Sequence, residues 1–294
     1  MSLYKPKTTI RKLTPSEFPA IFSEIPQPPK QLYIRGELPT GNLTYLCVVG
    51  SRNYTSYGRD ACEKLIAGLK GFPIVIVSGL ARGIDSIAHK KALDVGLKVM
   101  SFPGSGLDES ALYPHSNIKL AQDIENAGGC LISESEPAYR AQLYTFPRRN
   151  RLMAGISKAI LVIEAQEKSG TLITARLATE YNRDVLAVPG SIFSDTSKGT
   201  NRLIRQGATP VTCAEEVLDA LGFKVETDPA KQQKLFADCS PDERKVLDHL
   251  REPIERDELL RALKMPISDA TSLLSIMELK GMIREEYGEI RKDI

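Results

Sequence analysis

The sequence has few cysteines, few aromatic side chains and no long apolar run. Its five cysteines lie far apart, and no two of them form the C-x-x-C pair that zinc and redox sites use. We therefore expect no metal site, and reduced thiols mostly in the core of a cytoplasmic protein. The longest apolar run, residues 159–163, is far too short to cross a bilayer, and the amino terminus lacks an apolar stretch of signal-peptide length. Neither secretion nor membrane insertion is expected.

Common nucleotide-binding and catalytic motifs are also missing. No G-x-x-x-x-G-K-[ST] occurs, which argues against a P-loop ATPase. Residues 104–109, GSGLDE, match the first two glycines of the dinucleotide motif G-x-G-x-x-G, but Glu109 stands where the third belongs. His89 and His115 are better explained as surface or capping residues, and no residue pairing typical of nucleophilic catalysis is visible. We therefore expect no cofactor and no catalytic residue.

The pattern that is present predicts an α/β fold. A chain of 294 residues that is 42% hydrophobic can form one larger and one smaller domain. From about residue 45, short strands rich in Val and Ile alternate with helical patterns long enough for right-handed crossovers. This predicts a doubly wound, extended Rossmann-like fold with a mostly parallel sheet. The expected strands are 45–49, 74–77, 98–102, 130–132, 159–163 and 185–188, and the clearest helices are 60–70, 86–95 and 172–181.

Four segments are expected along the chain. Residues 1–44 are rich in proline and predict an extended lead-in that ends on a short strand or turn. Residues 45–221 form the Rossmann-like domain, and residues 222–240 lose the hydrophobic periodicity and predict a linker. Residues 241–294 contain three short amphipathic helical patterns followed by REEYGEIRK, which predicts a winged-helix-like domain.

Loops after two of the expected strands combine glycine with arginine. In an open parallel sheet, ligands bind where the strands end, because loops there expose backbone N–H groups and helix N-termini. Glycine lets the backbone turn and approach a phosphate, and an arginine can donate two hydrogen bonds to it. The candidate residues are Gly50, Ser51 and Arg52 after the first strand, and Gly79, Arg82 and Gly83 after the second.

A second group of candidates flanks the strand at 159–163. Residues 140–210 carry eleven Lys or Arg against five Asp or Glu, a net charge of +6, whereas residues 241–294 carry ten against thirteen, a net charge of −3. A polyanion is therefore expected to bind the first region. Both ends of the strand can serve one ligand only if helix 146–157 returns to the edge where residues 168–171 lie. The candidates are Arg148, Arg149, Asn150 and Arg151 before the strand, and Lys168, Ser169, Gly170 and Thr171 after it.

Several ordered blocks resemble the signature blocks of one family. GSRNYTSYG, SGLARGIDSIAHKKAL, FPRRNRLMAGIS and VPGSIFSDTSKGTNRLIRQGA are similar to those of the DNA-processing protein DprA family, also called Smf. The resemblance runs from about residue 32 to residue 220 and implies an extended Rossmann fold that binds single-stranded DNA taken up in natural transformation. It further implies a homodimer that loads the RecA recombinase and relieves the barrier posed by single-strand-binding protein.

The resemblance also assigns some of the candidate residues. In the family, a Gly-Ser-Arg loop and a basic R-N-R block contribute to the DNA groove, and the matching residues here are Gly50, Ser51 and Arg52, and Arg149, Asn150 and Arg151. The remaining candidates rest on their position and charge. Many members carry a helical domain in front, for which the 44-residue lead-in is too short. Stacking partners for bases are few, and the candidates are Tyr54, Tyr57, Tyr139, Tyr144 and Phe146.

Two other function classes stay open beside a non-catalytic DNA-binding mediator. One is a nucleotide-binding or nucleotide-processing enzyme similar to the LOG-like phosphoribohydrolases, whose motif P-G-G-x-G-T-x-x-E carries a catalytic Glu; this chain has Thr174 at that place. The other makes the winged domain the main DNA reader. Acids at Glu255, Asp257, Glu258 and Asp269 around the expected recognition helix favour a role in protein interaction or dimer support instead.

Overall fold

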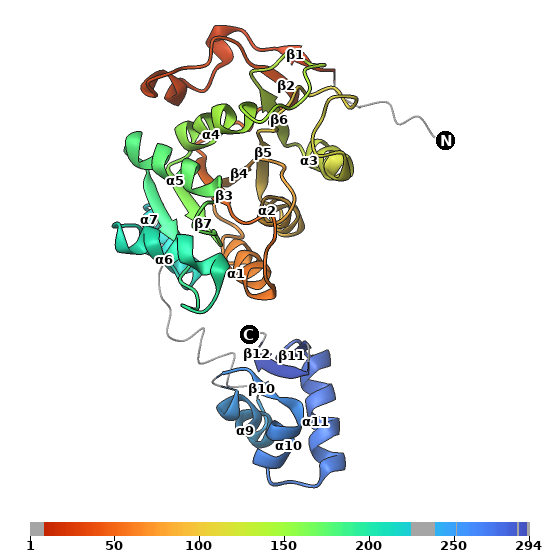
Figure 1. The fold of residues 1–294 in the computed structure, drawn as a ribbon. Helices are drawn as coiled ribbons and strands as arrows, with labels where there is room; N and C mark the ends of the chain where they lie inside the picture. The colour runs from red at the N-terminus through yellow and green to blue at the C-terminus, as the bar shows by residue number, and fades with distance from the viewer. Residues whose placement is uncertain (1–8, 225–238, 251, 287, 293–294) are drawn as a thin grey trace. The chain divides into compact units, whose positions relative to one another are not determined.

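A computed structural model describes residues 9–224, 239–250, 252–286 and 288–292 and divides the chain into two compact units, residues 1–225 and 226–294. Within the described part of the first unit, nine strands form one sheet in the order β1-β2-β6-β5-β4-β3-β7-β8-β9 (Figure 1). The strands from β6 to β9 in this order are parallel, and β1 and β2 add an antiparallel edge. Their bounds are β1 Arg11–Lys12, β2 Tyr33–Gly36, β3 Thr44–Val49, β4 Ile74–Ser78, β5 Lys98–Ser101, β6 Cys130–Ser133, β7 Ala159–Val162, β8 Asp184–Ala187 and β9 Thr209–Pro210.

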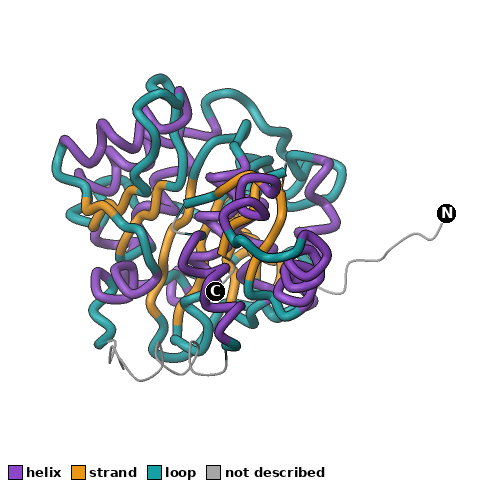
Figure 2. Tube along the Cα trace, turned by 90° about the horizontal axis from the view of Figure 1, so that it is seen from below, coloured by secondary structure: helices purple, strands orange, loops and turns teal. Residues whose placement is uncertain are grey.

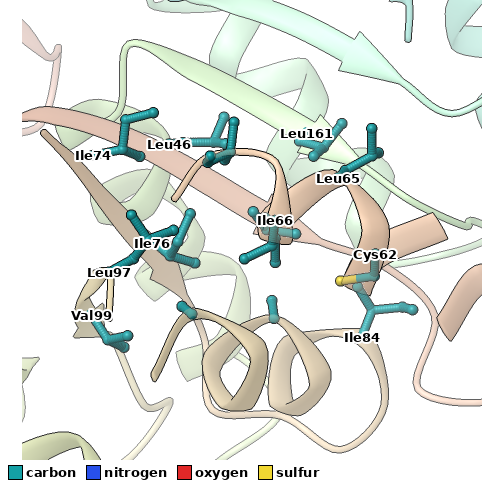
Figure 3. Close-up of a cluster of buried hydrophobic side chains, with 14 of the residues drawn as sticks. Leu46, Cys62, Leu65, Ile66, Ile74, Ile76, Ile84, Leu97, Val99 and Leu161 are labelled. Carbon is teal, nitrogen blue, oxygen red and sulfur yellow. The ribbon is translucent and has the colours of Figure 1, made fainter. Parts of the chain in front are cut away.

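Helices cover both faces of this sheet, as the apolar strands require (Figure 2). Helices α1, α2, α3 and α7 pack on one face, where Leu65 and Ile66 of α1 meet Leu46 and Ile76 of the sheet (Figure 3). Helices α4, α5 and α6 pack on the other face. The doubly wound α/β prediction is confirmed. The helix bounds are α1 Ser56–Ala67, α2 Ile84–Asp94, α3 Ile118–Asn126, α4 Thr145–Ile156, α5 Thr171–Glu180, α6 Lys198–Arg205 and α7 Ala214–Ala220.

The strand order reverses between β3 and β7. From β3 the chain adds β4, β5 and β6 in one direction, and it then returns to place β7 on the other side of β3. The loops that leave β3 and β7 therefore diverge toward opposite faces of the sheet. Such a reversal opens a crevice at the carboxyl ends of the strands, which is where open α/β sheets bind their ligands.

The proline-rich segment ends on a short strand, β2, as expected, but the part before it is not simply extended. Strand β2 pairs with β6 over four residues, and two short 3₁₀ helices, Pro15–Glu17 and Ala20–Glu24, precede it. Leu13, Phe22 and Ile25 are buried in the core on the α4 face. The prolines hide the hydrophobic periodicity, yet short 3₁₀ turns still bury the apolar side chains between them. Residues 9–44 therefore belong to the first unit.

The second unit has the predicted winged-helix form and its own apolar core. A capping box at Ser240, whose hydroxyl accepts from the N–H of Glu243 at 3.2 Å, begins its first helix. Most of the expected linker, residues 222–240, lies outside the described residues. The elements are α9 Pro241–His249, β10 Ile254–Glu255, α10 Arg256–Ala262, α11 Ile267–Leu279, β11 Ile283–Glu286 and β12 Glu289–Lys292, and the sheet order is β10-β12-β11.

Candidate functional site

A cleft of about 410 Å³ opens at the point where the strand order reverses. The loop after β3, the first half of α4 and the start of α5 form its walls. Eight of the residues predicted from the sequence line it together: Gly50, Ser51, Arg52, Arg149, Asn150, Ser169, Gly170 and Thr171.

The two groups of candidates that flank β7 do meet at one edge of the sheet. Helix α4 ends just before β7 begins, so its first turns lie at the carboxyl edge, opposite the start of β7. The loop after β7 reaches the same edge directly. Arg149 and Asn150 therefore line the cleft together with residues 169–171, which is the condition that the sequence left open.

Hydrogen bonds join the two loops of the cleft. The Thr171 hydroxyl donates to the Gly50 carbonyl at 3.1 Å, and the Ser169 hydroxyl accepts from the Thr171 N–H at 3.2 Å. The Ser51 carbonyl accepts from the N–H of Ile84 at 3.1 Å, which ties the β3 loop to the start of α2. The N-terminus of α5 lies here, and its partial positive charge favours an anion in the cleft. At the N-terminus of α2, the Asp85 carboxylate offsets that charge.

Three of the predicted glycines leave no room for a Cβ: Gly50, which lies against Ile84, and the two glycines of the loop after β4. Gly83 has φ +84°, and a Cβ there would lie 2.3 Å from the Ser51 carbonyl oxygen and 2.7 Å from the Arg52 Cα. A Cβ at Gly79 would collide with the guanidinium of Arg149. These glycines let the loop after β4 pack against the β3 loop and α4, so they shape the cleft from outside. At Gly170, by contrast, an added Cβ would meet nothing within 4 Å.

A smaller hollow of about 220 Å³ adjoins the cleft and shares Arg52 and Phe146 with it. The Arg52 guanidinium lies over the Phe146 ring, 5.3 Å from its centroid, and the Tyr113 ring lies 5.9 Å from the same ring. Arg82 lines this hollow too and donates to the Ser116 hydroxyl at 3.3 Å. Exposed cations thus lie beside aromatic faces, an arrangement that suits the phosphate and the base of a nucleotide.

Arg149 lies in the wall of the cleft and is only 8% exposed. Its guanidinium donates to the Phe102 carbonyl, and burial lowers the pKa of the side chain. The neighbouring Asp85 carboxylate accepts from the N–H groups of Gly79 at 3.1 Å and Ala81 at 3.3 Å. Burial raises the pKa of Asp85, and the Arg149 charge opposes that effect. Arg149 therefore ties α4 to the end of β5 and places a positive charge near Asp85.

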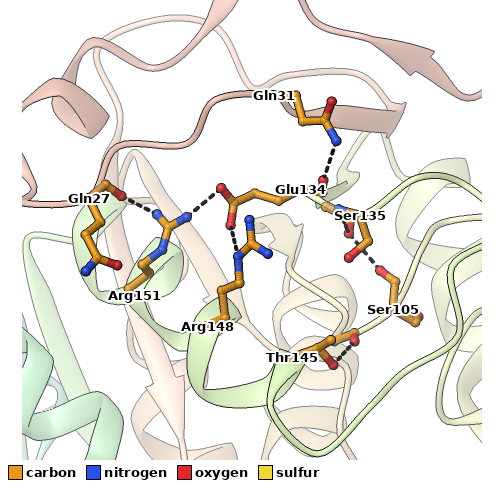
Figure 4. Close-up of polar contacts among 10 residues, drawn as sticks. Gln27, Gln31, Ser105, Glu134, Ser135, Thr145, Arg148 and Arg151 are labelled. Atoms are coloured by element: carbon orange, nitrogen blue, oxygen red, sulfur yellow. Dashed lines mark hydrogen bonds and ion pairs between the residues drawn. The ribbon is translucent and has the colours of Figure 1, made fainter.

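The other cations of the predicted set do not line the cleft, and two of them, Arg148 and Arg151, lie beside Glu134 (Figure 4). Arg151 is buried, donates to the Gln27 carbonyl and forms an ion pair with Glu134. Arg148 is 62% exposed and lies 3.5 Å from the second oxygen of the same carboxylate. Arg148 and Arg151 reach the same carboxylate because residues three apart lie on one face of a helix. Lys168 is exposed on the loop after β7 but does not line the cleft.

Sequence reasoning missed Asn53 and Gln166, which also line the cleft. Their place in the same two loops was the available signal. Glu164, at the end of β7, is buried and accepts from the N–H and hydroxyl of Thr55 and from the Thr196 hydroxyl, so it serves as a structural anchor for α1. The expectation of a surface or capping role is wrong for His89, which is fully buried, and fits His115, which is exposed.

Two kinds of site are not found in the described part of the chain. No helix there is long and apolar enough to span a membrane. Among the same residues, no group of three or more His, Cys, Asp or Glu side chains could hold a metal ion.

A doubly wound sheet with a cleft at its switch point is typical of Rossmann-type proteins, and arginines and aromatic rings beside such a cleft are features that suit a nucleic acid strand. A family model described as DNA recombination-mediator protein A matches residues 9–222, and one described as the DprA winged helix domain matches residues 226–289. The chain belongs to this DprA family of DNA recombination mediators.

Individual relatives agree with this assignment. Protein Smf of Escherichia coli is 38% identical over 267 residues, which cover 87% of this chain and 69% of the relative. The DNA processing protein DprA of Streptococcus pneumoniae is 41% identical over 206 residues, 70% of this chain and 72% of the relative. The solved structure of the S. pneumoniae protein has a TM-score of 0.67 over 74% of this chain and 75% of that one.

A second solved structure names a ligand for a relative. It is DprA from Helicobacter pylori, described in terms of its single-stranded DNA binding mode, with a TM-score of 0.65 at 29% identity over 74% of this chain and 98% of that one. These comparisons do not favour the nucleotide-processing alternative. The buried Thr174 lines the cleft where that alternative needs a carboxylate.

Proposed function

We propose that this recombination mediator binds single-stranded DNA in the cleft between β3 and α4, without cutting or modifying it. The observation that carries the proposal is the position of Arg52, an exposed cation that lies over Phe146 and also lines the cleft formed by the glycine and hydroxyl loops. Phosphates would bind to Arg52, Arg82 and the N-terminus of α5, while bases would stack beside Phe146. The ligand named for the H. pylori relative supports the same assignment.

The role of the bound strand follows from the family. We expect the protein to act as a homodimer that loads RecA onto incoming single strands in natural transformation and lowers the barrier posed by single-strand-binding protein. The winged unit, residues 241–294 of which carry a net charge of −3, is expected to support protein contacts and not to read DNA.

The structure leaves fewer of the predicted arginines free to contact phosphates of the DNA than the sequence suggests. Arg52 and Arg82 are exposed and available to phosphates. Arg149 and Arg151 are held by Phe102 and by Glu134, respectively, so we assign them to shaping the cleft wall and α4. Their positive charge still adds to the potential of the region.

The test is a titration of the full chain with a labelled single-stranded oligonucleotide and its duplex at several salt concentrations. We expect the single strand to bind more tightly, with an affinity that falls steeply as salt rises. Equal or tighter binding of the duplex, or no binding of the single strand at low salt, would overturn the proposal. A parallel titration with free nucleotides would then ask whether the cleft binds those instead.

A further inference from the structure

The loop between β8 and α6 carries two large apolar side chains that are exposed to solvent. Phe193 is 91% exposed and Ile192 is 77% exposed. Large apolar side chains exposed to this degree commonly mark a binding surface. Nothing in the phosphate-binding cleft uses them, because neither lines it.

The base of this loop is well anchored although its tip is exposed. The Tyr57 hydroxyl donates to the Pro189 carbonyl at 2.6 Å, and Asn201 donates from Nδ2 to the Gly190 carbonyl at 3.0 Å. At the tip, the Phe193 N–H donates to the Ser191 hydroxyl at 3.2 Å. Because the loop is already ordered, little conformational entropy is lost when a flat ligand stacks on the Phe193 ring.

The loop lies at the same edge of the sheet as the cleft. Strand β8 is parallel to β7, and β7 is parallel to β3, so the loops that follow all three leave the same edge. The end of β8 is two strands away from the end of β3, or about 10 Å at the usual strand spacing. Lys168 is on the loop after β7, between the two, and is exposed. Tyr57, which is 48% exposed, follows Arg52 in the chain and reaches the β8 loop through its bond to the Pro189 carbonyl.

We propose that Phe193 is a stacking platform for a base of the strand after it leaves the cleft, with Lys168 contacting a phosphate on the way. This inference rests on the proposed function and extends its binding site. The occupant is DNA and not a second copy of the chain, because one ring can stack one base, whereas a stable protein interface buries about 800 Å² on each partner. Two exposed side chains are too small a patch for that.

The absence of tryptophan from the chain gives a clean probe. Phe193→Trp would place a single tryptophan on the loop, and Phe146→Trp would place one beside the cleft. Titrated with oligothymidylate of about 4 nucleotides, the Phe146→Trp protein should lose fluorescence and the Phe193→Trp protein should not. With strands of about 16 nucleotides, near the upper end of single-domain site sizes, both should lose it.

The outcomes separate this inference from the proposed function. If long strands quench Phe146→Trp but leave Phe193→Trp unchanged, the cleft binds DNA and the platform is refuted. If neither is quenched and no binding is seen, the proposed function itself fails. If Phe193→Trp emission changes with protein concentration alone, the loop is an interface between copies and the inference is overturned.

Affinity measurements give an independent check. Phe193→Ala should weaken binding of the long strand roughly tenfold and leave the short strand unaffected. Lys168→Ala should follow the same length dependence with a smaller loss. The matched control is Leu279→Ala, which truncates another side chain that is 89% exposed, in the winged unit, and should change neither affinity. Equal losses for both strand lengths in Phe193→Ala would contradict the inference.

Discussion

Gly83 offers the sharpest test of how the cleft is built. The residue precedes α2 with φ +84°, a backbone conformation that side chains rarely adopt, so Gly83→Ala should cost about 1–3 kcal/mol of unfolding free energy from strain alone. The added Cβ would also lie 2.3 Å from the Ser51 carbonyl oxygen, well inside the 3.4 Å of an ordinary contact. The β3 loop must therefore retreat by about 1 Å, and Arg52 moves with it.

The expected effect on DNA binding follows from that displacement. A hydrogen bond from a charged donor contributes about 1.5–3 kcal/mol, so losing the Arg52 contact should weaken single-strand binding by about tenfold to a hundredfold. The assay is fluorescence anisotropy with a labelled oligothymidylate at constant salt. Thermal unfolding followed by circular dichroism measures the stability change on the same samples.

Gly96→Ala is the matched control. Gly96 also has a positive φ, +80°, but a Cβ there would meet nothing within 4 Å. This variant should lose a similar amount of stability, about 1–2 kcal/mol, and bind DNA like the parent. The reasoning is refuted if Gly83→Ala binds like the parent despite its lower stability, or if Gly96→Ala weakens binding equally.

Three further predictions concern the rest of the chain. Arg151→Ala removes one partner of the Glu134 carboxylate while Arg148 stays beside it, so the unfolding free energy in urea titrations should fall by about 1–3 kcal/mol. Unchanged stability with lost DNA binding would restore Arg151 as a phosphate contact. Burial and the Arg149 charge lower the pKa of His89 to about 3 in the folded protein. As the pH falls from 7 to 5, the imidazole therefore gains a proton in the unfolded chain but not in the folded one, and the free energy of unfolding should fall by about 2 kcal/mol. His89→Phe should lack that contribution to the slope. A 1–225 truncation should stay folded and keep most of the DNA affinity, and a folded fragment that no longer binds would make the winged unit the reader.

The sheet could be predicted because its strands are short, apolar and separated by helical patterns of crossover length. Strands β3 and β4 were expected within one residue of their observed bounds. The packing of the proline-rich segment could not be predicted. The burial of Leu13 and Phe22 depends on the pairing of β2 with β6, which is about a hundred residues away in the chain. No local periodicity reports such a contact.

The candidate site could be predicted as a set of loops but not as a set of side-chain directions. Glycines and cations in the loops that follow the strands identified the cleft. Within RRNR, however, the sequence does not say which arginine faces the cleft and which faces Glu134. That division depends on the rotation of α4, and α4 is oriented by the burial of Leu152, Met153 and Ile156.

The central claim is that exposed cations at this cleft hold a single strand by its phosphates. The most direct measurement is the salt dependence of single-strand affinity for the parent, Arg52→Ala and Lys70→Ala. The last variant removes an exposed cation just after the end of α1, the end of that helix opposite the β3 loop. We predict weaker binding for Arg52→Ala, with a slope of log affinity against log salt that is shallower by about 0.7, and parental behaviour for Lys70→Ala. Identical affinity and slope for Arg52→Ala and the parent would contradict the account.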